Sequence, residues 1–176
     1  AGACQVTANR NLHYYIVYKG MRAVQEHGPS EHAVILYAMY SSMLAKQGKF
    51  ADADKMAIKA LELLKNYPLC PDRPYIYMVL GTFSWLYTHP LKQAIDFQLR
   101  AHETGYEYGD IILGVVAGYS NAIINNYAQG LPLTQLSLHL NNLRTLVDSH
   151  GIKILAGSYY SRLVSMLTQA SSDNEL

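Results

Sequence analysis

Residues 33–67, AVILYAMYSSMLAKQGKFADADKMAIKALELLKNY, decide the fold that this sequence predicts. In the first half of the stretch, apolar side chains recur every three or four residues, which is typical of a helix with one apolar face. The pattern repeats after a tight turn at Gly48, so we expect two antiparallel helices. The apolar positions are Leu36, Tyr37, Tyr40, Met43 and Leu44, then Phe50, Ala53, Met56, Ala57, Ala60, Leu61 and Leu64. Neither helix can bury its stripe alone, so the pair should pack against further pairs.

Glycine and proline residues divide the rest of the chain into intervals that each fit one helix. The predicted helices are 8–27, 30–46, 50–66, 73–87, 90–104, 107–129, 132–149 and 152–169. No segment has the alternating pattern of a strand. We therefore predict an all-α fold, a right-handed tetratricopeptide-like array of about four antiparallel helix pairs. It would form a single domain over residues 1–170, followed by a disordered tail at 171–176.

Several positions within these helices carry specific expectations. Gly105 is expected to close helix 90–104, because glycine readily takes the left-handed conformation that ends a helix. Gly114 and Gly118 each cost about 1 kcal/mol of helix propensity relative to alanine. We expect them to permit close packing, with a helix break as the alternative. In the first helix the residues expected to point inward are Tyr14, Tyr15, Val17, Tyr18, Met21 and Val24.

The composition narrows the classes of partner. Among 176 residues, 50% are apolar and only 15% are charged, which suggests a surface covered by a partner. Lysine and arginine number 14 against 13 acidic residues, without a basic run, so we expect no nucleic acid. No apolar run reaches the ~18 residues of a membrane span, so we expect no membrane. Cys4 and Cys70 lack metal-ligand spacing and favour a reducing, cytoplasmic setting.

The central stretch resembles a tetratricopeptide repeat. Gly48, Phe50, Ala53, Ala60 and Leu61 stand where that consensus has its turn glycine, the following aromatic, the small contact alanine and the later Ala-Leu pair. Small residues at these positions let the second helix approach the first. The turns at Gly48, His89 and Gly130 recur every 41 residues, which is longer than the ~34 of a tetratricopeptide unit.

A longer resemblance covers residues 33–151. GDIILGVVAGYSNAIINNYAQGLPL, beginning at Gly109-Asp110, is similar to a hydrophobic helix in large predicted-ATPase signalling proteins. Those proteins join kinase-like, AAA/STAND-type ATPase and sensor histidine-kinase parts, and this helical region follows their ATPase module. The resemblance implies a scaffold or regulatory region. We therefore expect a fragment of a larger ATPase-containing signalling protein, with the ATPase module outside this sequence.

The sequence carries no catalytic or nucleotide-binding motif. A phosphate-binding GxxxxGK[ST] loop, GxGxxG, HExxH and GxSxG are all missing. We therefore expect neither an enzyme nor a cofactor.

Glu26-His27 and Glu31-His32 bracket a turn and could converge on a metal, but solvated polar residues beside a loop are the favoured interpretation, so no metal site is predicted. Asp52 and Asp54 diverge around the helix axis and are expected to interact with the helix dipole.

The predicted function is protein–protein interaction. The chain has 15 tyrosines, which we assign mainly to packing between helices, with an aromatic partner-binding surface as the alternative. First helices line the concave groove in tetratricopeptide arrays, and that register predicts the partner contacts. These are Ile35, Ala38, Ser42, Lys46, Ala117, Ser120, Ile124 and Tyr127. The partner would be a protein, a peptide or a sibling domain. Homodimerisation and a small-molecule-sensing domain that switches an attached effector stay open as alternatives.

Overall fold

The computed structural model describes residues 10–151, and throughout this part the chain is helical without strands. The all-α fold class is thereby confirmed. The helices are α2 (Arg10–His27), α3 (Glu31–Lys46), α4 (Phe50–Asn66), α5 (Arg73–Phe83), α6 (Trp85–Thr88), α7 (Leu91–Tyr108), the π-helix η1 (Ile111–Ala117), α8 (Gly118–Ala128) and α9 (Leu133–Ser149). The predicted helix 152–169 and tail 171–176 lie outside the described residues.

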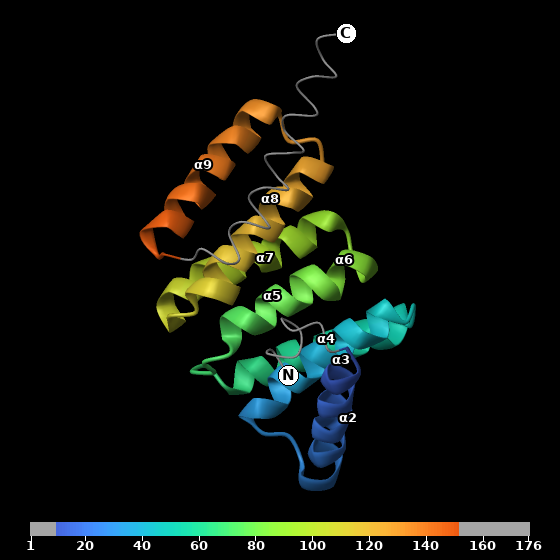
Figure 1. Ribbon diagram of the computed structural model, residues 1–176. Coiled ribbons are helices and arrows are strands. Elements are labelled where there is room, and N and C mark those ends of the chain that lie inside the picture. The colour runs from blue at the N-terminus through green and yellow to red at the C-terminus, as the bar shows by residue number, and fades with distance from the viewer. Residues whose placement is uncertain (1–9, 152–176) are drawn as a thin grey trace.

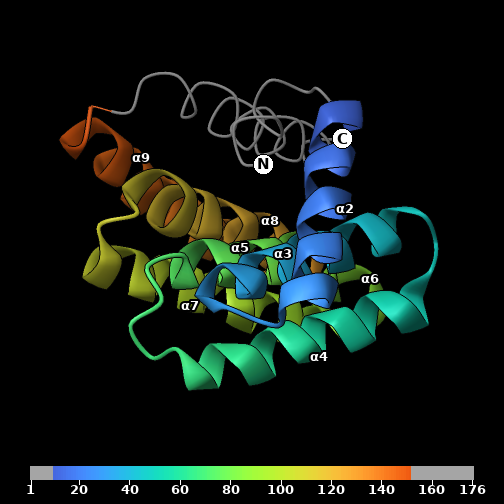
Figure 2. The same cartoon turned by 90° about the horizontal axis from the view of Figure 1, so that it is seen from below.

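The helices form a stack (Figure 1) in which α3 packs against α4, whereas α5 packs mainly against α7 and α3. The stack begins with α2 and ends with α9. Helices α5, α7, α8 and α9 have similar directions in this view. Figure 2 shows that α2 crosses α4 at a steep angle. Most contacts therefore join elements that are close in the sequence.

The predicted hairpin at residues 33–67 is formed by α3 and α4. Gly48 has a positive φ of 76°, and the backbone amide of Lys49 donates to the carbonyl of Leu44 at 2.9 Å, which closes α3. Along α4, Ala53, Ala57 and Ala60 are completely buried. Because these side chains are small, the two helices approach closely. This confirms the predicted helices and their glycine turn.

The predicted helix 73–87 is interrupted. It ends as α5 at Phe83, and Ser84 has φ −126° and ψ −68°, outside the helical range, before the short α6 begins. Ser84 is completely buried, and its hydroxyl lies 2.5 Å from that of Ser41 on α3. The continuous helix is therefore wrong, and a buried polar contact with a distant helix accompanies the break.

Gly105 does not end a helix, contrary to the sequence-based expectation. It is buried inside α7, which continues to Tyr108 and ends at Gly109, whose φ is 71°. A Cβ at Gly105 would lie 2.7 Å from the backbone nitrogen of Val115. Gly105 is thus a position where η1 approaches the backbone of α7, and Gly109 makes the turn.

The apolar stretch 107–129 forms two joined elements instead of one α-helix. Asp110 begins η1, and its carboxylate accepts a hydrogen bond from the amide of Leu113 at 3.1 Å. Close packing at Gly114 and Gly118 is confirmed: a Cβ at Gly118 would lie 2.7 Å from the carbonyl oxygen of Gln98. The seven-residue π-helix was not predicted.

The apolar core runs through α2 to α5 and continues to Ala101 of α7 and Ala117 of η1, while a second cluster joins α8 to α9. Val17 and Met21 of α2 are buried as expected. Tyr15 and Tyr18 are not, since 59% and 46% of these residues are exposed. The inward placement of Tyr15 is therefore wrong, whereas Tyr18 is partly exposed but its ring still meets Tyr40 of α3, with centroids 5.7 Å apart.

Candidate functional site

Half of the eight predicted partner contacts are buried. These are Ala38, Ser42, Ala117 and Ser120, of which at most 7% is exposed. Helix α3 packs against α2, α4 and α5, and η1 packs against α5, α7 and α8, so both elements have little free surface. The hydroxyl of Ser42 donates to the carbonyl of Met39 within its own helix at 2.8 Å. These four side chains are inaccessible to a partner in this structure.

The other four predicted contacts are Ile35, Lys46, Ile124 and Tyr127, which are half-buried or exposed. The ammonium group of Lys46 lies 4.7 Å from the ring centroid of Phe83, and Ile124 and Tyr127 pack against the cluster between α8 and α9. Helices α3 and α8 occupy separate levels of the stack (Figure 1), so the four do not meet on one surface. Their role as partner contacts stays a prediction.

Two hollows open at the surface of the described part of the chain. The first, of about 420 Å³, lies between α2, α3 and α5 and is lined by Ile16, His32, Ile35, Leu36, Met39, Asp72 and Tyr75. The second, of about 390 Å³, is lined by Ile58, Leu61, Glu62, Leu64, Lys65, Arg73, Tyr77, Trp85, Phe97 and Arg100. We call the second hollow the α4–α7 groove. It contains three cationic side chains, whereas the first has a single carboxylate and a histidine.

Aromatic rings form the base of the α4–α7 groove. Trp85 and Phe97 meet edge to face with ring centroids 4.5 Å apart, and Tyr77 meets Phe97 at 5.7 Å. Helix α6 packs against both α4 and α7, so Trp85 lies between the two walls. Such edge-to-face contacts contribute about 0.5–1.5 kcal/mol beyond the burial of area. The base is therefore apolar and held in a fixed geometry.

Arg73 lines the groove and closes α4. Its Nη2 atom donates to the carbonyl oxygen of Leu64 in the last turn of α4 at 3.3 Å, and to those of Tyr67 and Pro68 just beyond it at 3.1 and 3.2 Å. Its Nη1 atom donates to the hydroxyl of Tyr77 at 3.2 Å. The last carbonyls of a helix lack partners within it, and a guanidinium satisfies them well. The Nε atom of Arg73 is buried without a hydrogen-bond partner.

Two further cations line the groove and come from different helices. Lys65 comes from α4 and Arg100 from α7, where the guanidinium of Arg100 lies 5.4 Å from the ring centroid of Phe97. Glu62, the single carboxylate in the lining, lies 3.8 Å from Lys59. Among residues 10–151, neither Lys65 nor Arg100 forms an ion pair. Both charges are therefore available to an anionic group.

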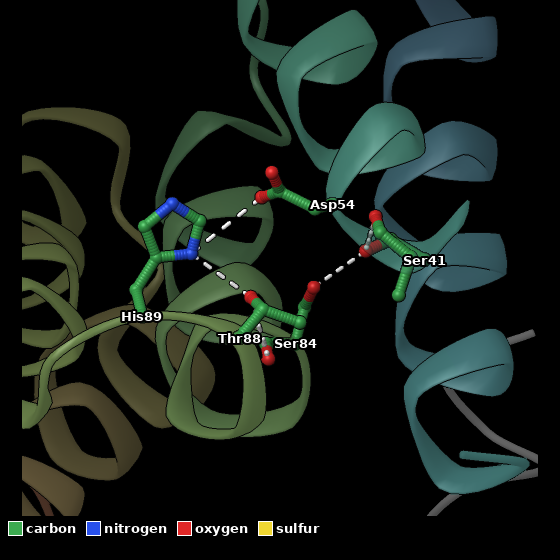
Figure 3. A network of polar contacts seen from close by, with 6 residues as sticks. Ser41, Asp54, Ser84, Thr88 and His89 are labelled. Carbon is green, nitrogen blue, oxygen red and sulfur yellow. Dashed lines mark hydrogen bonds and ion pairs between the residues drawn. The ribbon is translucent and has the colours of Figure 1, made fainter. Parts of the chain in front are cut away.

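A polar cluster joins α3 and α4 to the residues on either side of Trp85 (Figure 3). Asp54, expected to interact only with the helix dipole, has its carboxylate 3.5 Å from Nδ1 of His89. The hydroxyl of Thr88 lies 2.9 Å from the same nitrogen. A catalytic relay needs the hydroxyl and the carboxylate on different ring nitrogens. Since both groups meet Nδ1, this histidine cannot pass a proton from Thr88 to Asp54.

The polar cluster fixes the position of the groove's tryptophan. The ring of His89 stacks on Trp85 with centroids 4.1 Å apart and planes 16° apart. On the other side of the break, the Ser84 hydroxyl meets that of Ser41, which donates to the carbonyl of Ala53 at 2.6 Å. These contacts tie α6 to α3 and α4. Trp85 is thus positioned by His89, which stacks on its ring, and by Ser84, which precedes it in the chain. Its indole Nε1 is buried without a hydrogen-bond partner.

Sequence reasoning missed this groove because its residues come from four elements, α4 to α7. One signal was present: Trp85 is the chain's single tryptophan, and tryptophan and arginine are the residue types most enriched at binding hot spots. Comparisons with protein-family models, curated proteins and solved structures give no match. The two resemblances noted in the sequence therefore rest on their own residues.

The described residues can also be checked for metal-ion sites and for membrane-spanning helices. Over residues 10–151, no group of three or more histidine, cysteine, aspartate or glutamate side chains could hold a metal ion. His27 and His32, which the sequence placed beside a turn where they could converge on a metal, are both exposed. None of the helices in this range is long and apolar enough to cross a membrane.

Proposed function

We propose that this chain is a non-catalytic helical-repeat module that binds another protein. In this proposal its helix pairs form a right-handed, tetratricopeptide-like array, and it belongs to a larger ATPase-containing signalling protein in the cytoplasm. The stacking of helices in sequence order and the regular spacing of the turns support the array. The similarity of residues 33–151 to the helical region of such proteins supports the parent.

The observation that carries the proposal is the α4–α7 groove. It combines an immobilised tryptophan with two arginines and a lysine in a depression of about 390 Å³. Hot spots at protein interfaces are typically such aromatic and arginine clusters, set in well-packed surroundings. A protein segment or a sibling domain is the partner that this surface fits.

The alternative of a small-molecule sensor has less support. A sensing domain would enclose its ligand and bury most of the ligand's surface. The two hollows described above both open to solvent. Self-association stays an alternative because large apolar side chains, such as Leu69 and Leu138, are exposed at 84% and 61%.

The test is selection of binding peptides from a random-peptide display library on the immobilised chain. Enriched peptides that lack tryptophan are then titrated into the chain while the emission of Trp85 is followed. We expect saturable binding and a change in this emission. Binding to a Trp85→Leu variant, checked for folding by circular dichroism, is measured by titration calorimetry, because this variant has no tryptophan. It should be lost, whereas Leu138→Ala on α9 should keep binding. Failure to enrich any peptide contradicts the proposed function.

A further inference from the structure

We infer that the α4–α7 groove binds an acidic segment of another polypeptide chain, with a carboxylate held between Lys65 and Arg100 and a neighbouring apolar side chain on the aromatic base. This inference rests on the proposed function and names the chemistry of the partner. It follows from the distribution of charge in the groove and from the character of its base.

The charge in the groove is unbalanced. Its lining contains Lys65, Arg73 and Arg100 against Glu62, and Glu62 lies within an ion pair with Lys59. Other charged side chains at the surface, such as Arg22 with Glu26 and Arg144 with Asp148, pair within their own helices. Unpaired cations that line one depression favour an anion there, because their potentials add.

One buried donor adds to the positive potential of these cations. The indole Nε1 of Trp85, a residue that lines the groove, has no acceptor in the described part of the chain. An unpaired N–H group carries partial positive charge and favours anions nearby. This donor and the cations thus act in the same direction.

The aromatic base distinguishes a peptide from an inorganic anion. Beside the cations lie Tyr77, Trp85 and Phe97, together with Ile58, Leu61 and Leu64. A bare phosphate or carboxylate gains nothing from this apolar surface. A polypeptide can place an apolar side chain there while a neighbouring carboxylate reaches the cations. Burying one large apolar side chain contributes about 1.5–3 kcal/mol.

A nucleic acid fits the groove less well. Single-stranded nucleic acids bind through bases stacked on open aromatic faces and through a track of cations along the phosphates. One face of Trp85 is already covered by His89 at 4.1 Å, and Phe97 is only 7% exposed. The chain as a whole has a net charge of +1 and no basic run. We therefore assign the groove to an acidic peptide.

The test uses the peptides enriched in the library selection and compares each with its amide counterpart, in which asparagine and glutamine replace aspartate and glutamate. We expect the enriched set to be rich in acidic residues beside apolar ones. The amide counterparts should bind at least about tenfold more weakly. Binding of the acidic peptides should weaken as salt rises, because exposed charges are screened over about 8 Å at physiological ionic strength.

Charge-reversal variants assign the site. Lys65→Glu and Arg100→Glu should each weaken binding at least about tenfold, whereas Lys92→Glu should change it less than about twofold. Lys92 is the matched control, since it is exposed on α7 outside the groove lining and its reversal changes the net charge equally. Circular dichroism confirms that each variant is folded.

The outcomes separate the two proposals. Enriched peptides without acidic residues, or amide counterparts that bind equally well, overturn the acidic-segment inference and leave the interaction function standing. Equal losses for Lys92→Glu and Arg100→Glu overturn the assignment to the groove. The assignment to an acidic peptide is overturned in favour of a nucleic acid if an oligo-thymidylate binds the chain, if Arg100→Glu abolishes that binding, and if the enriched peptides do not compete with it. No enrichment at all overturns both proposals.

Discussion

Gly105 and Gly114 lie against each other where α7 crosses η1, and the crossing has no room for a side chain on either residue. A Cβ built on Gly114 would lie 2.9 Å from the Cα atom of Gly105, and a Cβ on Gly105 would lie 2.7 Å from the backbone nitrogen of Val115. Backbone atoms cannot move aside as the end of a flexible side chain can. The distance between these two helices therefore depends on both glycines.

Gly105→Ala should destabilise the fold by about 1–3 kcal/mol, the usual range for overpacking a close contact. Alanine would gain about 1 kcal/mol of helix propensity, but the clash with the η1 backbone outweighs it. The free energy of unfolding in urea measures the change. Gly20→Ala is the control, because its Cβ would meet only the tip of the Leu36 side chain. Equal stabilities for Gly105→Ala and wild type would contradict the crossing described here.

Ser41 and Ser84 should be energetically coupled. Ser41 donates to the carbonyl of Ala53, so the hydroxyl of Ser84 is the donor between the two serines. Ser41→Ala strands this buried hydroxyl and should cost about 1–3 kcal/mol, whereas Ser84→Ala leaves Ser41 bonded and should cost about 0.5–1.5 kcal/mol. A double-mutant cycle in urea unfolding measures the coupling. Additive effects of the two substitutions would show that the hydroxyls do not interact.

Alkaline pH should destabilise the fold through Tyr75. Burial raises the pKa of Tyr75 to about 12, with the carboxylates of Asp110 and Asp72 adding to the effect. In the unfolded chain the pKa of tyrosine is about 10, so between these values the unfolded state releases a proton that the folded state keeps. The stabilisation is complete below pH ~10 and is lost as pH rises towards ~12, by about 2–3 kcal/mol.

The measurement is the free energy of unfolding at several alkaline pH values for wild type and Tyr75→Phe. The decline should be shallower in Tyr75→Phe, because phenylalanine has no proton to lose. Tyr15→Phe is the control and should follow the wild-type curve, since Tyr15 is 59% exposed. Parallel curves for Tyr75→Phe and wild type would rule out this source of alkaline instability.

The sequence predicted most turns at glycines that stand outside any tight contact, with Gly109 as the exception. Gly28, Gly48, Gly130 and Gly151 have positive φ, and a Cβ on any of them would meet nothing within 4 Å. Gly105 was misassigned, because a glycine that ends a helix and a glycine that admits a neighbouring helix look identical in a sequence. Only the packing partner distinguishes the two roles.

The candidate site could not be predicted for a related reason. The register of a helical repeat predicted which side of α3 faces outward, but α5 packs against α3. Lys65 and Arg100 are far apart in the sequence and line one groove together with Trp85 of the short α6, which begins after the break at Ser84. A buried contact with Ser41 accompanies that break, and no local pattern encodes it.

Gln98 should be the most demanding polar position in the core. It is completely buried on α7, its Nε2 atom donates to the carbonyl of Gly81 at 3.1 Å, and its Oε1 atom accepts from Asn125 Nδ2 at 3.0 Å. Gly81 belongs to the last turn of α5, whose carbonyls have no partners within the helix. One side chain thus satisfies the end of α5 and joins it to α8.

Gln98→Met should destabilise the fold by about 1–3 kcal/mol for each polar group left unsatisfied, even though methionine has a similar shape. Urea unfolding measures the loss, and Gln93→Met, at an exposed position of the same helix, should stay within about 0.5 kcal/mol of wild type. Adding Asn125→Ala to Gln98→Met should cost less than Asn125→Ala alone, because the amide of Asn125 has then already lost its acceptor. If Gln98→Met is as stable as wild type, the hydrogen bonds of Gln98 do not contribute to the stability of the three-helix connection.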